Sequence, residues 1–255
     1  IGRLGPGLLG FSALTGAWRN AVGLVREVRR RWPDLPVAMG NTHASVFAEQ
    51  VLADGHADLV IRGEGEITLP ELAAALEAGD GPADVDGVSW RDGDTIRHNP
   101  DRRPIEDLDA LPWPAWELLD LTAWRYQQIP LVNLRTHPVP LMASRGCPYR
   151  CEFCSQDKAV RAFRTRRVEG VVDEVDHMVQ TLGFRAFGFN DSYFPWDEDT
   201  GLEFSERIRS LPWPDDVRWV TATRVDRVTD PLMAALPSSG LHAIVYGLES
   251  VHHAA

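Results

Sequence analysis

The sequence predicts an α/β protein in which two segments of alternating strands and helices are joined by a connector. Three observations lead to this prediction. Short apolar runs followed by helical periodicity recur in residues 1–78 and again in residues 139–255. A polar stretch rich in proline and tryptophan, residues 79–138, separates these segments. All three cysteines lie in one short loop near the start of the second segment.

The composition is that of a globular protein and narrows its class. Of the 255 residues, 44% are hydrophobic and 25% are charged, which is enough apolar material for a core. No apolar run reaches the ~18 residues of a membrane span, so no membrane association is expected. The net charge of −11 argues against nucleic acid as a partner, because nucleic-acid surfaces are basic. Reduced thiols in a chain that shows no signal peptide predict a cytoplasmic location.

The first segment predicts an open parallel sheet, because short strands alternate with helices through short loops. The helix over 17–31 is expected to end at Trp32, since the position before a proline disfavours helical backbone. Ligands of such sheets bind at the carboxyl ends of the strands. Strands are expected at 8–12, 36–40 and 58–61, and helices at 17–31, 44–53 and 69–78.

The connector contains one ordered feature and a stiff linker. Asp92-Gly93-Asp94 lies between two β-type runs and predicts a hairpin with an Asp-Gly turn. Prolines and apolar residues interleave over 104–114, which indicates a linker packed on a surface rather than a flexible one.

The cysteine loop, residues 144–158, is the strongest chemical signal in the chain. Cys147, Cys151 and Cys154 have the spacing C-x3-C-x2-C, and no fourth cysteine exists. Cluster irons are normally held by four thiolates, so three would leave one iron open, and an open position is where a metal does chemistry. Gly146 and Pro148 suit a tightly curled loop.

Two other uses of these cysteines were weighed. Three cysteines with His137 or His177 could form a Cys3His zinc site, although zinc loops usually pair their cysteines as C-x2-C on two separate loops. Disulfides are disfavoured by the odd number of cysteines.

The second segment predicts a run of βα units, the pattern of a barrel whose active site lies at the carboxyl ends of its strands. The arginines between the cysteine loop and the first helix are expected to be solvated or to contact a phosphate or carboxylate; they are Arg161, Arg164, Arg166 and Arg167. Strands are expected at 140–144, 187–191, 219–223 and 243–247, and helices at 168–182, 197–211 and 231–236.

The cysteine loop resembles that of the radical S-adenosylmethionine (radical SAM) enzymes. The shared features are the cysteine spacing, the aromatic Phe153 before the third cysteine and the short strand before the loop. The resemblance implies a [4Fe-4S] cluster held by the three cysteines, whose unique iron chelates the amino and carboxylate groups of S-adenosylmethionine (AdoMet). It also implies reductive cleavage of AdoMet to a 5′-deoxyadenosyl radical.

The strand ends of the second segment resemble those of the same family. The motifs are N-D-S-Y-F at 190–194, T-R-V-D at 223–226 and G-L-E-S at 247–250. The resemblance implies that Asn190 and Asp191 lie near the AdoMet amino group. Arg224 is expected to face the AdoMet carboxylate or the substrate. Glu249 and Ser250 are expected to bind the ribose, and Phe153 completes the AdoMet set.

The first segment resembles the flavodoxin-like cobalamin-binding domain. Ser12-Ala13-Leu14 matches S-x-L, and Gly40 matches the first glycine of a pair whose second is replaced by Asn41. The family's D-x-H-x-x-G motif is absent from the printed sequence, so no histidine ligand to cobalt is predicted. The stretch 62–66 is typical of cobalamin-dependent radical SAM proteins. The cobalamin contacts implied are Ser12, Leu14, Thr15, Gly40, Asn41, Gly63 and Glu64.

These features predict a partial flavodoxin-like (Rossmann-type) cobalamin-binding domain followed by a partial (βα)6 radical SAM barrel, cut at both ends. The expected boundaries are 1–78 for the first domain, 79–138 for the linker and 139–255 for the barrel. The expected reaction is methyl transfer to, or rearrangement of, an unactivated carbon of a small molecule, with flavodoxin or ferredoxin as electron donor. No catalytic side chain is assigned. The alternatives are a radical SAM enzyme without bound cobalamin, or a non-catalytic fragment or scaffold with a zinc or cluster site.

Overall fold

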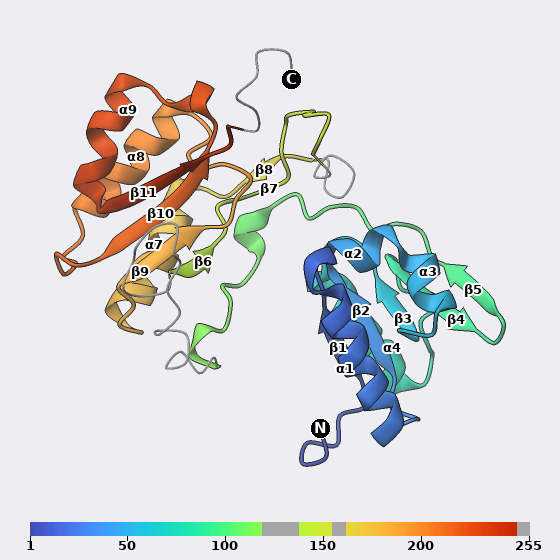
Figure 1. Cartoon of the computed structure of the whole chain (residues 1–255). Coiled ribbons are helices and arrows are strands. Elements are labelled where there is room, and N and C mark those ends of the chain that lie inside the picture. Colours follow the sequence, from blue (N-terminus) through green and yellow to red (C-terminus); the bar gives the residue numbers. More distant parts are fainter. Residues whose placement is uncertain (119–137, 155–161, 249–255) are drawn as a thin grey trace. The chain divides into compact units, whose positions relative to one another are not determined.

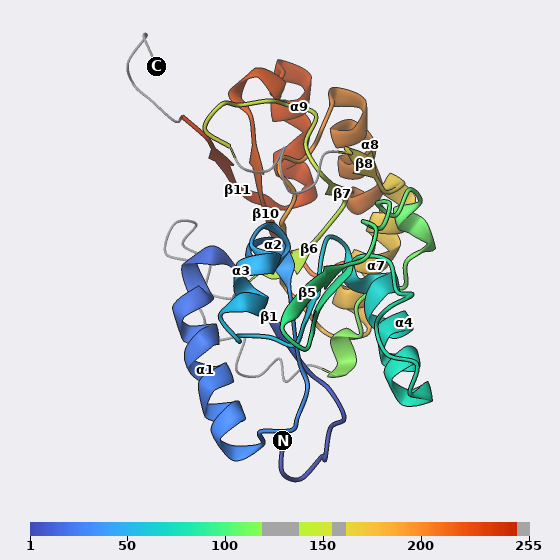
Figure 2. The same ribbon diagram turned by 90° about the vertical axis from the view of Figure 1, so that its right-hand side faces the viewer.

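The computed structural model describes residues 1–118, 138–154 and 162–248, and the chain divides into two compact units (Figures 1 and 2). The first unit comprises Ile1–Ile105 together with Arg150–Val160, and the second comprises Glu106–Tyr149 and Arg161–Ala255. Among the described helices, none has the length and apolar character needed to cross a bilayer.

The first unit is built on a five-stranded sheet with the order β1-β2-β3-β4-β5. The first three strands are parallel, as expected, and the last two are antiparallel. The hairpin predicted for the connector is confirmed, and it extends this sheet because Val88 pairs with Ile61. The strands are β1 Leu9–Ser12, β2 Val37–Gly40, β3 Leu59–Ile61, β4 Val88–Asp92 and β5 Thr95–His98.

Helices cover both faces of this sheet (Figure 1). Val37 and Met39 of β2 pack against α1 and α3, whereas Ala38 between them shares a cluster with Leu72 of α4. This alternation is what the two-residue period of a strand requires. The helix expected over 44–53 is divided in two at Phe47. The helices are η1 Thr15–Ala17, α1 Trp18–Arg31, α2 Asn41–Val46, α3 Ala48–Ala53 and α4 Gly65–Ala78.

The second unit is built on a four-stranded parallel sheet with the order β6-β9-β10-β11. Each strand neighbours the next along the chain, which is the order of a βα barrel. The strands are β6 Val139–Leu141, β9 Ala186–Phe189, β10 Arg218–Thr223 and β11 Leu241–Tyr246. The helices are η2 Leu108–Ala110, η3 Trp116–Leu118, α7 Val168–Gln180, α8 Glu198–Arg209, η4 Val225–Arg227, α9 Asp230–Ala235 and η5 Leu236–Ser239.

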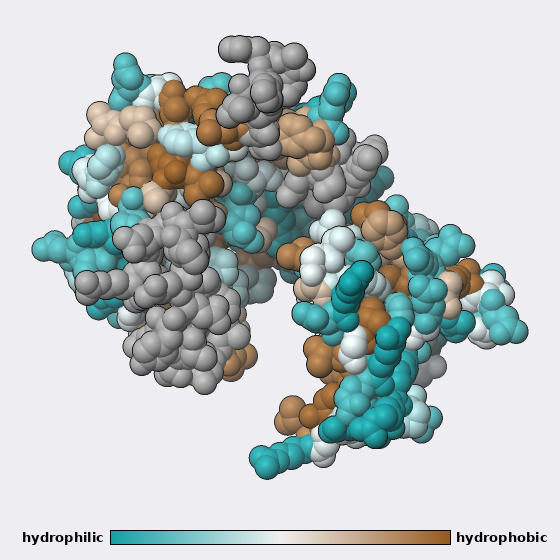
Figure 3. All heavy atoms as spheres, in the orientation of Figure 1, coloured by the Kyte–Doolittle hydropathy of each residue, from teal (hydrophilic) through white to brown (hydrophobic). Residues whose placement is uncertain are grey.

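An aromatic core joins this sheet to its helices. Trp219 of β10 is completely buried, stacks on Phe187 of β9 at 6.3 Å between ring centroids, and meets Phe204 of α8 edge-on at 5.3 Å. On the same strand, the side chains that alternate with Trp219 are only partly buried. Apolar side chains, among them the 45% exposed Val245 of β11, lie at the surface over β10 and β11 (Figure 3).

Arg166 is held in a buried ion pair, so it meets the second of the two expectations, contact with a carboxylate, rather than solvation. Its guanidinium pairs with Glu174 of α7 at 2.5 Å, and Glu174 is only 2% exposed. The same guanidinium donates to the Gly170 carbonyl at 3.1 Å. Trp116 donates to the other oxygen of Glu174 at 3.3 Å. Arg167, by contrast, is exposed, as expected, and pairs with Asp109.

We expect Glu174→Gln to lower the free energy of unfolding by about 3 kcal/mol, because it removes the nearer carboxylate of the buried Arg166 guanidinium and leaves only Asp109, at 3.9 Å. Urea unfolding followed by tryptophan fluorescence measures the loss. The control is Glu203→Gln, whose pair with Arg207 is exposed on α8 and should contribute about 0.3–0.5 kcal/mol. Equal losses in the two variants would show that the buried ion pair stabilises the fold no more than the exposed one.

Candidate cofactor site

The cysteine loop leaves and re-enters the second unit through a closed neck, which we define as residues 142–146 and 162–166. Within it, β7 Ser144–Arg145 pairs antiparallel with β8 Arg164–Thr165. The Arg166 amide extends this pairing by donating to the Ala143 carbonyl at 2.8 Å. Residues far apart along the loop are therefore fixed side by side at its base.

Gly146 is required where the loop leaves the neck. Its φ of 83° is in the left-handed region that side chains disfavour. A Cβ there would lie 2.3 Å from the Ala162 carbonyl oxygen. Backbone freedom and close approach thus both demand a glycine, the residue expected from the curl of the loop.

The three cysteines offer a sulfur donor set. None forms a disulfide, and all are partly exposed. The Cys154 amide donates to the Cys151 carbonyl at 3.0 Å, which makes the end of the motif a turn. Within the described ranges, no three His, Cys, Asp or Glu side chains are grouped so as to hold a metal ion. The donor chemistry nevertheless fits an iron–sulfur cluster, because uncrosslinked, accessible thiols are the groups that bind cluster iron.

Asp191 lies just beyond the carboxyl end of β9 and faces the neck. Its carboxylate accepts the Ala143 amide at 3.1 Å to each oxygen and the Ser144 hydroxyl at 2.5 Å. Burial raises the pKa of Asp191 to about 6, although hydrogen bonds from Ser144 and Ala143 oppose the rise.

Arg224 follows β10 and covers an aromatic ring of the cysteine loop. Its guanidinium lies 3.9 Å from the centroid of the Tyr149 ring and pairs with Asp226 at 2.9 Å. Tyr149 also meets the ring of Tyr193 edge-on at 5.5 Å, and burial raises the pKa of Tyr193 to about 12. The sequence analysis missed Tyr149 and Tyr193, although their places inside the cysteine loop and the N-D-S-Y-F motif were signals.

The other residues predicted for AdoMet are placed as follows. Asn190 is exposed just after β9, and its backbone amide donates to the Leu141 carbonyl at 2.8 Å. Phe153 is 70% exposed. Glu249 and Ser250 are outside the described residues, as is His137. His177 lies on α7 with its ring 5.7 Å from that of Trp113.

In the first unit, the ends of β1 and β2 are tied together by two side-chain contacts. The Asn41 amide donates to the Ser12 hydroxyl at 3.0 Å, and Asn41 itself has a φ of 77°, unusual outside glycine. Thr15 and His43 are in contact at 3.1 Å, and burial lowers the pKa of His43. Four of the residues implied for cobalamin therefore lie at or just after the carboxyl ends of neighbouring parallel strands; they are Ser12, Thr15, Gly40 and Asn41.

The end of β3 joins the same edge. The Gly63 amide donates to the Ser45 hydroxyl at 3.1 Å, and Ser45 donates to the Asn41 carbonyl at 3.0 Å. The Glu64 carboxylate instead accepts a hydrogen bond from the backbone amide of Ile105, at 2.7 Å. Leu14 is 59% exposed. The edge thus presents exposed polar groups beside an exposed apolar side chain.

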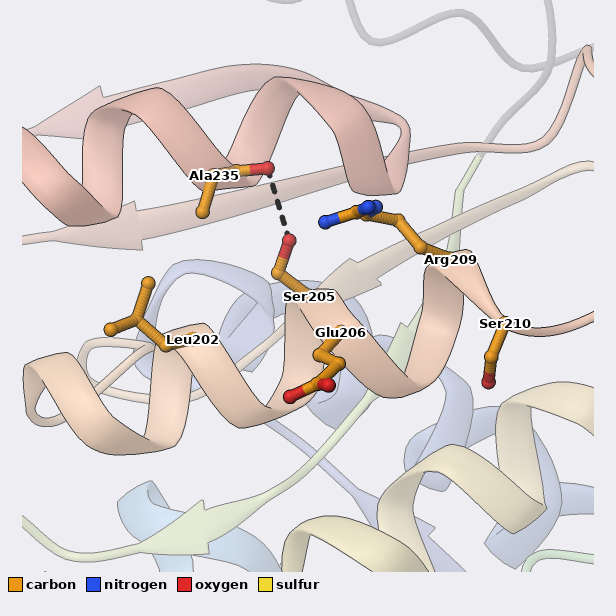
Figure 4. Close-up of a pocket in the computed structure, with 6 residues that line it drawn as sticks. All are labelled: Leu202, Ser205, Glu206, Arg209, Ser210 and Ala235. Atoms are coloured by element: carbon orange, nitrogen blue, oxygen red, sulfur yellow. Dashed lines mark hydrogen bonds between the residues drawn. The ribbon is translucent and has the colours of Figure 1, made fainter.

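A pocket elsewhere in the second unit lies on the helical layer, between α8 and the end of α9 (Figure 4). The Ser205 hydroxyl donates to the Ala235 carbonyl at 3.0 Å across it, and Arg209 extends along the same side. Because it is formed by helices rather than strand ends, it contains none of the residues predicted for cofactors.

The chain is similar to several known proteins along nearly its whole length. Residues 1–73 match the family model of the B12 binding domain. The chain is 27% identical over 252 residues to an uncharacterized methyltransferase of Pyrococcus horikoshii, covering 98% of this chain and 53% of that protein. It is 30% identical over 253 residues to the anaerobic magnesium-protoporphyrin IX monomethyl ester cyclase of Cereibacter sphaeroides, covering 97% of this chain and 40% of the cyclase. The match over residues 1–73 confirms the predicted resemblance of the first segment to a cobalamin-binding domain.

A solved structure confirms the predicted fold class of the chain. The cobalamin-dependent S-adenosylmethionine radical enzyme OxsB matches with a TM-score of 0.77 and 21% identity, covering 96% of this chain and 36% of OxsB. The chain also spans only about half the length of the methyltransferase and less of the cyclase.

We expect Gly146→Ala to destabilise the folded chain more than Gly183→Ala does. Both glycines have left-handed backbones, at 83° and 73°, so each variant should lose roughly 1 kcal/mol. Only Gly146 also faces a close carbonyl, since nothing lies within 4 Å of a Cβ at Gly183. The overlap should add about 1–3 kcal/mol. Thermal unfolding measures the difference, and matched losses would contradict the close approach at the neck.

Proposed function

We propose that this chain supplies the cofactor-binding part of a cobalamin-dependent radical SAM enzyme. The observation that supports this most is the C-x3-C-x2-C loop, which follows the first strand of a parallel sheet and is closed at its base by the neck. The B12 binding match over residues 1–73 supports the cobalamin part of the proposal.

In this proposal Cys147, Cys151 and Cys154 hold a [4Fe-4S] cluster, whose binding would draw the three sulfurs together. When bound, cluster and AdoMet supply the electron and the carbon radical of the reaction. The exposed Asn190 side chain, at the carboxyl end of β9, can offer its amide oxygen to the AdoMet amino group. Phe153 stays the proposed apolar contact, and Glu249 and Ser250 the proposed ribose contacts.

The first unit would hold cobalamin against the ends of β1 to β3. Ser12, Thr15 and Asn41 present hydroxyl and amide groups there, while Gly40 and Gly63 allow backbone to approach a ligand closely. Leu14 provides apolar surface beside them, and Glu64 shapes the turn after β3.

Two relatives, a methyltransferase and a cyclase that acts on a porphyrin ester, support the reaction class. We propose methyl transfer to, or rearrangement of, an unactivated carbon of a small molecule. One-electron reduction would use a donor such as flavodoxin or ferredoxin, and we propose a cytoplasmic location, which reduced thiols favour.

We expect the chain, reconstituted with iron and sulfide without oxygen, to convert AdoMet to 5′-deoxyadenosine when reduced with dithionite. Cys147→Ala should lower both bound iron and product at least tenfold, because cluster irons depend on thiolate ligands. Omitting dithionite is the control for hydrolysis of AdoMet. Product that persists in the cysteine variant would contradict a role for this loop in the cleavage.

A second function, radical SAM chemistry without bound cobalamin, is favoured by one substitution. Asn41 stands where the family has a second glycine, and its amide engages the hydroxyl of Ser12. A side chain there occupies space at the strand end that glycine would leave to a ligand.

Titration with aquacobalamin, followed by its absorbance, separates the two functions. Binding by the unaltered chain supports the first, and its absence supports the second. If Asn41 blocks the site, as the second function requires, Asn41→Gly should tighten binding roughly fivefold, since it releases Ser12 from a hydrogen bond with a net value of about 1 kcal/mol. Adding Ser12→Ala should cancel this gain. Weaker binding by Asn41→Gly would mean that the amide itself contacts the ligand.

A further inference from the structure

Hydrogen-bond donors of the neck occupy most of the acceptor positions of the Asp191 carboxylate. The Ala143 amide lies 3.1 Å from each of its oxygens, and the hydroxyl of the buried Ser144 donates at 2.5 Å. The Ser144 amide is a further donor to it. An ionised carboxylate has about four acceptor positions, so these donors use most of its capacity.

The same short segment is held from its other side by Arg166. The Arg166 amide donates to the Ala143 carbonyl at 2.8 Å, and its guanidinium donates to the Met142 carbonyl at 3.1 Å. Arg166 is itself fixed by the buried Glu174. Asp191 on one side and Arg166 on the other therefore clamp the backbone of residues 142–144.

The clamp is close in sequence to the first thiol. Only Arg145 and Gly146 separate Ser144 from Cys147, so the direction in which the chain leaves the neck sets where Cys147 can lie. The side chain of Asn190 differs from that of its neighbour Asp191. Asn190 is exposed, and among the described residues no partner of its side-chain amide is found.

We propose that Asp191 is a positioning residue of the cysteine loop, which fixes residues 143–144 so that Cys147 meets the other two thiols, and that it is not itself a ligand of AdoMet. This deepens the proposed function and rests on it, because it assigns to the cluster site a positioning residue outside the C-x3-C-x2-C motif. Asn190 keeps the AdoMet-facing place at the end of β9.

The test compares Asp191→Ala, Asp191→Asn and Ser144→Ala with a matched control, Asp176→Ala. Asp176 is also a partly buried aspartate of the second unit, but it accepts a hydrogen bond from Trp213 at 2.7 Å and does not touch the neck. Amide hydrogen exchange of the metal-free chain is measured over 142–146, with α8 as the internal reference. Iron bound after anaerobic reconstitution is measured on the same samples.

We expect Asp191→Ala to exchange at least tenfold faster over 142–146 with α8 unchanged, and to bind several-fold less iron. Asp191→Asn, which keeps one acceptor oxygen, should recover part of both, and Ser144→Ala should show a smaller loss in the same direction. Asp176→Ala should match the unaltered chain in both. If Asp191→Ala unfolds, faster exchange in the other two neck variants supports the proposal and unaltered exchange overturns it.

Unchanged exchange or full iron loading in Asp191→Ala would overturn the positioning role. If the unaltered chain binds no iron, the proposed function fails, and the exchange comparison alone decides whether Asp191 holds the neck.

Discussion

The closed neck of the cysteine loop is the constraint on which the rest of the second unit depends. It requires a backbone at Gly146 that other residues disfavour, with the Ala162 carbonyl in the place of a side chain. It also requires acceptors and donors from β9 and from the segment before α7 to satisfy the chain at 142–144. A loop whose base is fixed in this way loses less conformational entropy when it orders around a cofactor.

The carboxylates of Glu174 and Asp191 hold the neck region, and they differ in how their negative charge is compensated. Glu174 faces the Arg166 guanidinium directly, so its charge is compensated. The donors that contact Asp191 are neutral backbone amides and the Ser144 hydroxyl, and burial raises the pKa of Asp191 to about 6. The folded chain therefore binds a proton that the unfolded chain releases near pH 4, and stability falls as the pH rises from about 4 to about 6. An acid retained at such a cost is typical of functional positions.

Periodicity and spacing were enough to predict the strands of the two larger sheets, most helices and the three-cysteine loop, because these depend on local pattern, whereas the short pair β7–β8 was not predicted. The break at Phe47 within the predicted helix 44–53 was not visible locally. The burial of Arg166 and the stacking of Arg224 on Tyr149 could not be predicted either, since each depends on a partner distant in sequence. Asp191 was singled out by its strand-end position, but the direction of its carboxylate is a tertiary property.

The central claim is that the cysteine loop holds a cubane with one iron open to AdoMet. Electron paramagnetic resonance of the reduced, reconstituted chain, recorded with and without AdoMet, tests it most directly. The account predicts a [4Fe-4S] signal whose g-values shift when AdoMet is added, because the open iron gains new ligands. A cubane signal that AdoMet leaves unchanged, or a chain that forms no cubane, would contradict it.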